Sequence, residues 1–250
     1  MERVSRRASR ALKTPFEESN RRLLAAQLGW WSNLEPSERL RMEDLIRVFL
    51  VDKTIEGVFG YTPDDDVRVL IAAQACLLIL GLDYGFYDDV SAIVVSPGVV
   101  IQQGSRRLDG GVLSDDHPRL AGQEMLHGPV LLVWDRVAND ARHPERGHNV
   151  VFHEFAHKLD MRNGAADGLP PLTATLSGRW RSQMPALLAR LRAGTLMPID
   201  AYAATNPAEF LAVVTEAFFL LPTELADAEP ELYGLLQEFY RQDPKARDRS

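Results

Sequence analysis

Residues 150–160, with the sequence VVFHEFAHKLD, constrain this chain more than any other stretch. His153 and His157 lie four residues apart, and Glu154 follows the first histidine. Each residue of an α-helix turns the chain by about 100°, so positions i and i+4 fall nearly in line. Both imidazoles therefore point the same way, whereas the apolar side chains gather on the opposite side, namely Phe152, Phe155, Ala156 and Leu159. One helix can thus bury an apolar face and present two nitrogen ligands on the other.

A pair of imidazoles in this H-E-x-x-H arrangement predicts a zinc site. Neutral imidazole nitrogens bind zinc at about 2.0–2.1 Å, and a catalytic site keeps three protein ligands and one open position for water. Glu154 lies beside the first ligand, near that open position, and we expect it to be the general base. The motif also arises by chance, so the prediction depends on a third ligand further along the chain.

The third ligand is expected on a helix that begins at Asn206-Pro207. Glu209 and Glu216 lie seven residues apart at the border of its apolar face, where a carboxylate is costly unless it is paired or binds a metal. We expect Glu216 to bind the metal and Glu209 to orient a histidine ring. Two glutamates at the solvent edge are the alternative, and pattern alone gives the two interpretations about even weight.

Two further residues are assigned roles near this site. Tyr202, just before the second helix, could donate its hydroxyl to a developing oxyanion, although a structural role is equally compatible with its position. Asp160 is expected to orient a histidine ring or to close the end of the motif helix. A metzincin would have glycine at position 160 and histidine or aspartate at 163, and Asp160 with Asn163 excludes that class.

The cysteine and the remaining histidines of the chain do not indicate a second catalytic or metal site. Cys76 is the only cysteine, which excludes an internal disulfide and a cysteine-ligated zinc site and fits a reducing cytoplasm. The four remaining histidines are expected to lie in loops or have no assigned role, and these are His117, His127, His143 and His148.

Composition and charge favour one acidic globular domain that binds neither nucleic acid nor membrane. The net charge of −7 argues against nucleic acid as the main partner. Residues 1–22 carry seven basic and three acidic side chains, and we expect a flexible basic segment there, followed by a single domain at residues 23–250. The longest apolar run, residues 67–82, is shorter than the roughly 20 residues that span a bilayer and predicts a core helix capped by one of three aspartates, Asp64, Asp65 or Asp66.

The periodicity of the chain predicts an α+β fold, mainly helical, with a small mixed sheet beside the motif helix. Helices are expected at residues 36–52 and 173–192 and short strands at residues 93–95, 99–102 and 129–137. The last of these is a candidate edge strand for holding an extended peptide. Polar loops are expected at residues 104–123, which could form a lid, and at residues 139–148.

Four blocks of sequence resemble the Mlc titration factor A family of bacterial zinc-dependent peptidases, whose catalytic core is similar to that of anthrax lethal factor. The blocks are AAQACLLILGLD at residues 72–83, HNVVFHEFAHKLDMRNG at 148–164, DAYAATNPAEFLAVVTEAFF at 200–219 and FYRQDP at 239–244. The resemblance implies a zincin-like metallopeptidase of the cytoplasm with one zinc ion per chain. It also implies zinc bound by His153, His157 and Glu216, with Glu154 as the base.

The expected reaction is metal-assisted hydrolysis of peptide bonds, with aminopeptidase-like activity on small peptides among the implied activities. Two alternatives stay open. Some members of the family bind the repressor Mlc, so the chain could instead be a regulatory protein that sequesters a transcriptional repressor, with hydrolysis secondary. A closed zinc site that only stabilises the fold is the other alternative.

Overall fold

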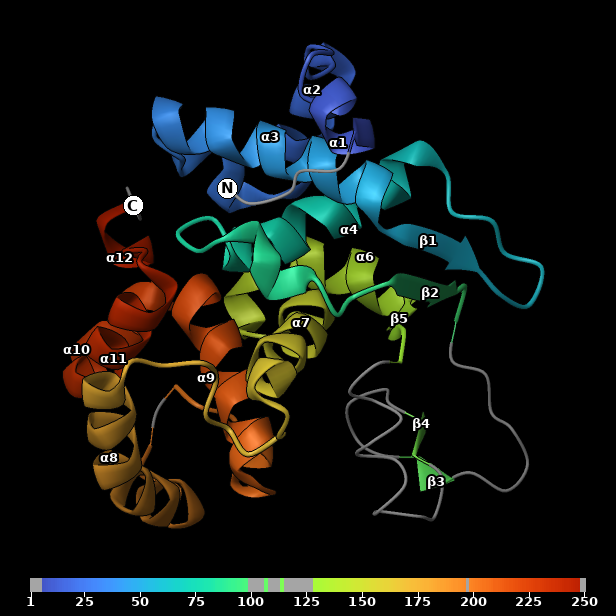
Figure 1. Cartoon of the computed structure of the whole chain (residues 1–250). Helices are drawn as coiled ribbons and strands as arrows, with labels where there is room; N and C mark the ends of the chain where they lie inside the picture. Colours follow the sequence, from blue (N-terminus) through green and yellow to red (C-terminus); the bar gives the residue numbers. More distant parts are fainter. Residues whose placement is uncertain (1–5, 99–105, 108–112, 115–127, 197, 248–250) are drawn as a thin grey trace.

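The computed structural model describes residues 6–98, 106–107, 113–114, 128–196 and 198–247 (Figure 1). Its helices are α1 (Arg6–Ala11), α2 (Glu18–Gln27), α3 (Pro36–Asp52), α4 (Asp65–Leu78), α6 (Trp134–Arg142), α7 (Val150–Asp160), α8 (Ala174–Arg192), α9 (Pro207–Leu220), α10 (Pro222–Ala228), α11 (Pro230–Tyr240) and α12 (Pro244–Arg247). Its strands are β1 (Thr54–Gly57), β2 (Ala92–Ser96), β3 (Arg106–Arg107), β4 (Leu113–Ser114) and β5 (Val130–Val133).

The motif helix α7 is central to this arrangement. It packs against α9 on one side and against α4 and β5 on others. Figure 1 shows α7 and α9 side by side in the middle of the molecule, with the sheet on one side and α8, α10 and α11 on the other. The buried side chains Phe152 and Phe155 anchor α7 in the core, which confirms the apolar face expected for residues 150–160.

Helix α4 is the core helix expected from the apolar run. The Asp64 side chain accepts a hydrogen bond from the Val67 amide at 2.9 Å, so Asp64 is the capping residue among the three candidates. Eleven of the helix's side chains are buried, including the polar side chain of Gln74. In the part of the chain that the structure describes, no helix combines the length and the hydropathy that a membrane span requires.

The sheet beside α7 has the strand order β1-β2-β5, and both pairings are parallel. Ile55, Ile93 and Val130 are partners across it and all are buried, whereas the next row along the strands faces outward. Parallel neighbours need a crossover connection, and α4 supplies it between β1 and β2. The expected sheet is therefore present, but in this part of the chain it is parallel and not mixed.

Strand β5 is shorter than expected. The sequence predicts a strand over residues 129–137 and a polar loop over 139–148, but the strand ends at Val133 and α6 begins at Trp134. Both predictions are wrong for residues 134–142, which form a helix. Val137, predicted to lie in a strand, is buried on the apolar side of α6. Strand β5 does lie at an edge of the three-stranded sheet and contacts α7. The expected strand at 99–102 and the loop at 104–123 lie largely outside the described residues.

The basic N-terminal part of the chain contains two helices, α1 and α2, where the sequence predicts a flexible segment at residues 1–22. Ala8 of α1 is buried, and α1 packs against α3. The guanidinium of Arg21 on α2 donates two hydrogen bonds to the Glu43 carboxylate on α3, at 2.7 and 2.9 Å. These contacts connect residues on both sides of the predicted boundary.

The loop after α7 ties the start of α9 to the end of α7. The Asp160 carboxylate accepts a hydrogen bond from the Gly168 amide at 2.9 Å. Gly168 has φ +73°, and a Cβ added there would lie 2.2 Å from the Pro207 carbonyl oxygen. Only glycine allows the loop to approach the first residue of α9 this closely.

We therefore expect Gly168→Ala to lower the free energy of unfolding more than Gly164→Ala does. Gly164 also has positive φ, at +90°, but no atom lies within 4 Å of an added Cβ, so its substitution tests the backbone conformation alone. The left-handed conformation costs about 1–2 kcal/mol in both variants, and the steric clash should add about 1–3 kcal/mol at Gly168. Urea titrations followed by circular dichroism measure both losses, and equal losses would contradict this account.

Candidate metal centre

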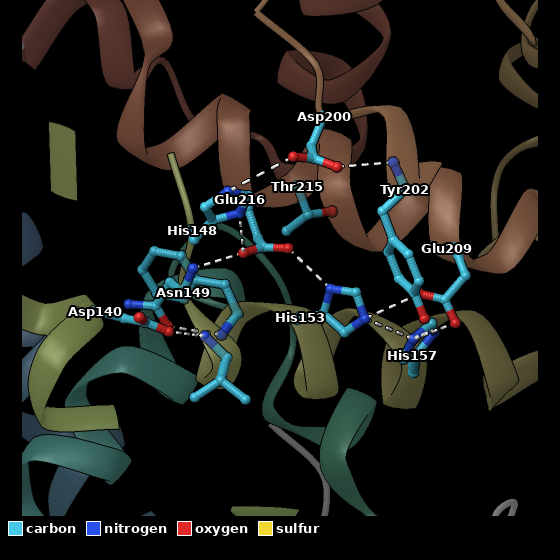
Figure 2. Close-up of polar contacts among 12 residues, drawn as sticks. Asp140, His148, Asn149, His153, His157, Asp200, Tyr202, Glu209, Thr215 and Glu216 are labelled. Carbon is cyan, nitrogen blue, oxygen red and sulfur yellow. Dashed lines mark hydrogen bonds and ion pairs between the residues drawn. The ribbon is translucent and has the colours of Figure 1, made fainter. Parts of the chain in front are cut away.

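Helix α7 positions the two histidines of the motif. The Asn149 side chain caps the helix by accepting a hydrogen bond from the Phe152 amide at 3.0 Å. One turn apart, the rings of His153 and His157 meet edge to face, with centroids 4.8 Å apart. Their Nε2 atoms lie 3.2 Å from each other, so two nitrogen lone pairs can converge on one point (Figure 2).

Helix α9 brings a carboxylate to the same point. Asn206 caps this helix by accepting a hydrogen bond from the Glu209 amide at 3.0 Å, and Pro207 occupies the first turn. Glu209 therefore projects from the first turn of α9. Its carboxylate oxygens lie 3.1 Å from His153 Nε2 and 3.6 Å from His157 Nε2.

These three residues fit a divalent metal ion. Ligand atoms about 2.0–2.1 Å from a tetrahedral zinc lie about 3.3 Å from one another, close to the distances of 3.1, 3.2 and 3.6 Å observed here. Among the residues that the structure describes, His153, His157 and Glu209 form the one group with this geometry.

The environment of Glu209 supports the same interpretation. Its Oε2 atom is buried and accepts no hydrogen bond from the described residues. It lies 3.1 Å from His153 Nε2 as an ion pair, but not where an N–H of that ring would point. A buried oxygen left in this way needs a partner, and a cation between the two atoms would supply one.

Glu216 lies on the other side of the His153 ring. Its Oε1 atom is 2.8 Å from His153 Nδ1, and its Oε2 atom accepts a hydrogen bond from the Asn149 amide at 2.5 Å. The sequence predicts Glu216 as a ligand beside the two histidines and Glu209 as a residue that orients a ring. In the structure Glu209 lies at the converging nitrogens and Glu216 lies behind the ring (Figure 2).

The two carboxylates have a strong effect on the pKa of His153. Burial lowers this pKa, but the neighbouring carboxylates of Glu209 and Glu216 outweigh burial and raise it to about 10. Burial acts to raise the pKa of Glu209, yet the two histidines hold it well below its usual value. The centre therefore favours a positive charge between Glu209 and the rings, whether a proton or a metal ion carries it.

Glu154 is buried beside this centre. Burial raises its pKa above the usual value for a glutamate, although the nearby histidines act in the opposite direction. Its Oε1 atom has no hydrogen-bond partner among the described residues. A buried carboxylate with a raised pKa and an unused acceptor is suited to taking up a proton.

A pocket of about 420 Å³ adjoins the His153 side of the centre. Tyr202, from the short helix η5 (Ala201–Ala204), lines it, and its ring centroid lies 6.3 Å from that of His153. His148 also lines this pocket, and its ring nitrogens lie 3.8 Å from an Asp200 oxygen and 3.9 Å from a Glu216 oxygen. His148 thus lies near the centre but outside the group of converging ligands.

The other candidates from the sequence have different surroundings. The Asp160 carboxylate accepts hydrogen bonds from the backbone of the loop after α7, as expected for a role at the helix end rather than for one on a histidine ring. Burial raises the pKa of Asp160 to about 6. His143 is partly exposed and lies 3.2 Å from Glu145. His117 and His127 lie outside the described residues.

The chain is similar to proteins of one bacterial family. Residues 2–241 match the family described as glucose-regulated metallo-peptidase M90. An uncharacterized protein of Synechocystis, slr2042, is 35% identical over 95% of this chain and 89% of its own length. Mlc titration factor A is 33% identical in Salmonella gallinarum, over 86% of this chain and 83% of the relative, and 30% identical in Escherichia fergusonii, over 96% and 90%.

These matches cover nearly the whole chain, including α7, α9 and the pocket between them and η5. They confirm the family resemblance expected from the sequence blocks, and they agree with a centre whose donors suit a metal ion. The chain belongs to the glucose-regulated metallopeptidase M90 family.

Proposed function

We propose that this metallopeptidase hydrolyses peptide bonds at a single zinc ion held by His153, His157 and Glu209. The observation that carries the proposal is the convergence of two Nε2 atoms and one carboxylate at distances of 3.1–3.6 Å. Two nitrogens and one oxygen are a common donor set for catalytic zinc, whereas closed structural sites have four protein ligands. The three-donor set therefore favours a catalytic centre over one that only stabilises the fold.

Zinc at this centre would act as a Lewis acid on a substrate carbonyl and make a water molecule more acidic. The residues of the chain supply the rest. We infer that Glu154 accepts a proton from the attacking water and then donates it to the nitrogen of the leaving amine, so that the carboxylate is regenerated. Its buried position and raised pKa support this role.

Glu216 acts on the centre indirectly in this proposal. Its carboxylate accepts the Nδ1–H of His153, which fixes the tautomer and leaves the Nε2 lone pair free for the metal. This differs from the sequence expectation, in which Glu216 is the third ligand. Tyr202 lines the pocket beside His153, and we propose that its hydroxyl donates a hydrogen bond to the oxyanion of the intermediate.

The substrate is proposed to be a peptide or protein in the cytoplasm. The edge position of β5 beside α7 supports binding of an extended peptide by main-chain hydrogen bonds. The same proposal includes aminopeptidase-like activity, a zincin-like fold and a single peptidase domain at residues 23–250. It does not include nucleic acid as a direct partner.

The proposal predicts that Glu209→Ala and Glu216→Ala affect metal binding to different degrees. Loss of Glu209 removes a ligand, whereas loss of Glu216 removes a partner of a ligand and should weaken zinc binding by about 10–100-fold. We expect a larger loss for Glu209→Ala, measured by competition with a chromogenic chelator. A larger loss for Glu216→Ala would restore Glu216 as the third ligand.

Metal affinity should also increase with pH. Because the pKa of His153 is raised to about 10, both ring nitrogens are protonated at neutral pH in the metal-free protein. A metal must displace the proton on Nε2 in order to bind there. Displacement of one proton gives about a tenfold change in affinity per pH unit. Chelator competition between pH 6 and 8 measures this slope, and an affinity independent of pH would contradict the assignment.

Replacement of Glu154 separates catalysis from metal binding. Glu154→Gln should leave the zinc content near one ion per chain and lower kcat for a peptide substrate by about 10²–10⁴-fold, because the amide cannot accept the proton. Metal analysis and turnover of a fluorogenic peptide library measure the two effects. A metal-replete Glu154→Gln protein with unchanged turnover would refute the role of Glu154.

A second function is suggested by the name Mlc titration factor A that several relatives carry. We infer that this chain could titrate a transcriptional repressor by binding it, with hydrolysis secondary. The Glu154→Gln variant distinguishes the two functions, because a binding role should survive that substitution with unchanged affinity for the repressor. A role that requires hydrolysis should be lost with it.

A further inference from the structure

A polar side chain lies among the buried residues of helix α4. Gln74 is fully buried in α4, between residues that are almost all hydrophobic. A buried amide is costly unless its donors and acceptor are used. Gln74 Nε2 donates to the Leu70 carbonyl within the same helix at 3.1 Å, and Gln74 Oε1 accepts from Asn149 Nδ2 at 2.7 Å.

Asn149 uses all of its polar groups near the start of α7. Its Oδ1 atom caps the helix, its Nδ2 atom donates to Gln74, and its backbone N–H donates to Glu216 Oε2 at 2.5 Å. The other oxygen of Glu216 lies 2.8 Å from His153 Nδ1. A continuous row of hydrogen bonds therefore leads from Gln74 on α4 through Asn149, at the start of α7, and Glu216, in the second half of α9, to the ring of His153. Figure 2 shows its last three members.

Each member of this row is shielded from water. Gln74, Asn149 and Glu216 are between 0% and 4% exposed, so water competes little for their hydrogen bonds. Hydrogen bonds in such a network strengthen one another and restrict each side chain to one orientation. Glu216 contacts the His153 ring with Oε1 and the Asn149 amide with Oε2. The side chain of Asn149 is in turn bonded to Gln74.

We propose that Gln74 is a positioning residue that acts through Asn149 and Glu216 on His153. It fixes the Asn149 side chain, the Asn149 cap fixes the direction of the N–H that holds Glu216, and Glu216 orients the ring that presents Nε2. This inference rests on the proposed metal centre and extends it to a residue on a third helix. Partners of metal ligands commonly contribute about 10–100-fold to metal affinity.

The alternative is that Gln74 only stabilises the packing of α4 against α7. Thr215 provides a matched control, because it is fully buried and directly precedes Glu216 on α9. Its hydroxyl is 2.7 Å from the Tyr240 hydroxyl on α11 and so belongs to a different contact. Thr215→Val removes one buried hydrogen bond near the centre without breaking the row from Gln74 to His153.

The first experiment compares Gln74→Met with Thr215→Val. Methionine matches the length of glutamine but cannot accept the Asn149 hydrogen bond, so zinc should bind about tenfold more weakly. Thr215→Val should change zinc affinity less than about twofold, since its contact does not include a partner of the ligands. Chelator competition gives the affinities, and the thermal midpoints of the metal-free proteins show how much each variant loses in stability.

Gln74→Glu tests the chemistry of the contact, because it retains an oxygen that can accept from Asn149 Nδ2. We expect it to bind zinc more tightly than Gln74→Met. The visible spectrum of the cobalt-substituted protein should change in Gln74→Met, since a reoriented ring alters the ligand field, and should stay as in the unsubstituted chain for Thr215→Val. Equal loss of affinity in Gln74→Met and Thr215→Val, or no loss in either, would overturn the proposal.

The double variant tests the route of the effect. If Gln74 acts through Glu216, Gln74→Met should cost less than about twofold in zinc affinity in a Glu216→Gln background. A full tenfold further loss would show that Gln74 acts by another route. If Glu209→Ala weakens zinc binding but Gln74→Met does not, the proposed function stands and this inference fails; if the unsubstituted chain binds no zinc, both fail.

Discussion

The contact between α7 and α9 is the interaction on which the rest of the site depends. His153 lies between two carboxylates of α9, with Glu209 at its Nε2 atom and Glu216 at its Nδ1 atom. Both contacts depend on the distance between α7 and α9 and on how far one helix is shifted along its axis relative to the other. The buried aromatic contact of Phe152 with Phe219, with centroids 5.6 Å apart, holds the helices together close to the polar groups. Hydrophobic packing thus determines the geometry in which a charged centre can form.

Much of the helical framework is predictable from the sequence, because long amphipathic segments carry their own signals. Helix α3 agrees with its prediction at both ends, and α8 starts one residue later than predicted. Shorter elements are harder to predict: β1 has four residues and its partner lies on another segment, so nothing local marks it as a strand. The apolar run after Pro129 continues into α6 without a polar break, and its division at Trp134 depends on packing rather than on composition.

The candidate site divides in the same way. The pairing of His153 with His157 is local to one helix and follows from their spacing. The choice between Glu209 and Glu216 is not local, because seven residues make almost two full turns and put both side chains on the same face of α9. They differ by about 10 Å along the axis, and only the position of α7 relative to α9 decides which of them meets Nε2. The caps give a partial signal, since Asn206-Pro207 puts Glu209 in the first turn of α9, near the end of the loop that returns from α7.

That loop has a consequence for how such chains can vary. Gly168 touches Pro207 although 39 positions separate them in the chain, and Asp160 holds Gly168 from the end of α7. The contacts of Gly168 with Asp160 and Pro207 therefore fix the start of α9 beside α7. The segment between Gly168 and Pro207, which contains α8, leaves and returns at this point. Insertions or deletions within that segment can alter its length while leaving Glu209 where it is. A search for related centres that relies on a constant number of residues between the histidines and the glutamate would consequently overlook chains with the same arrangement in space.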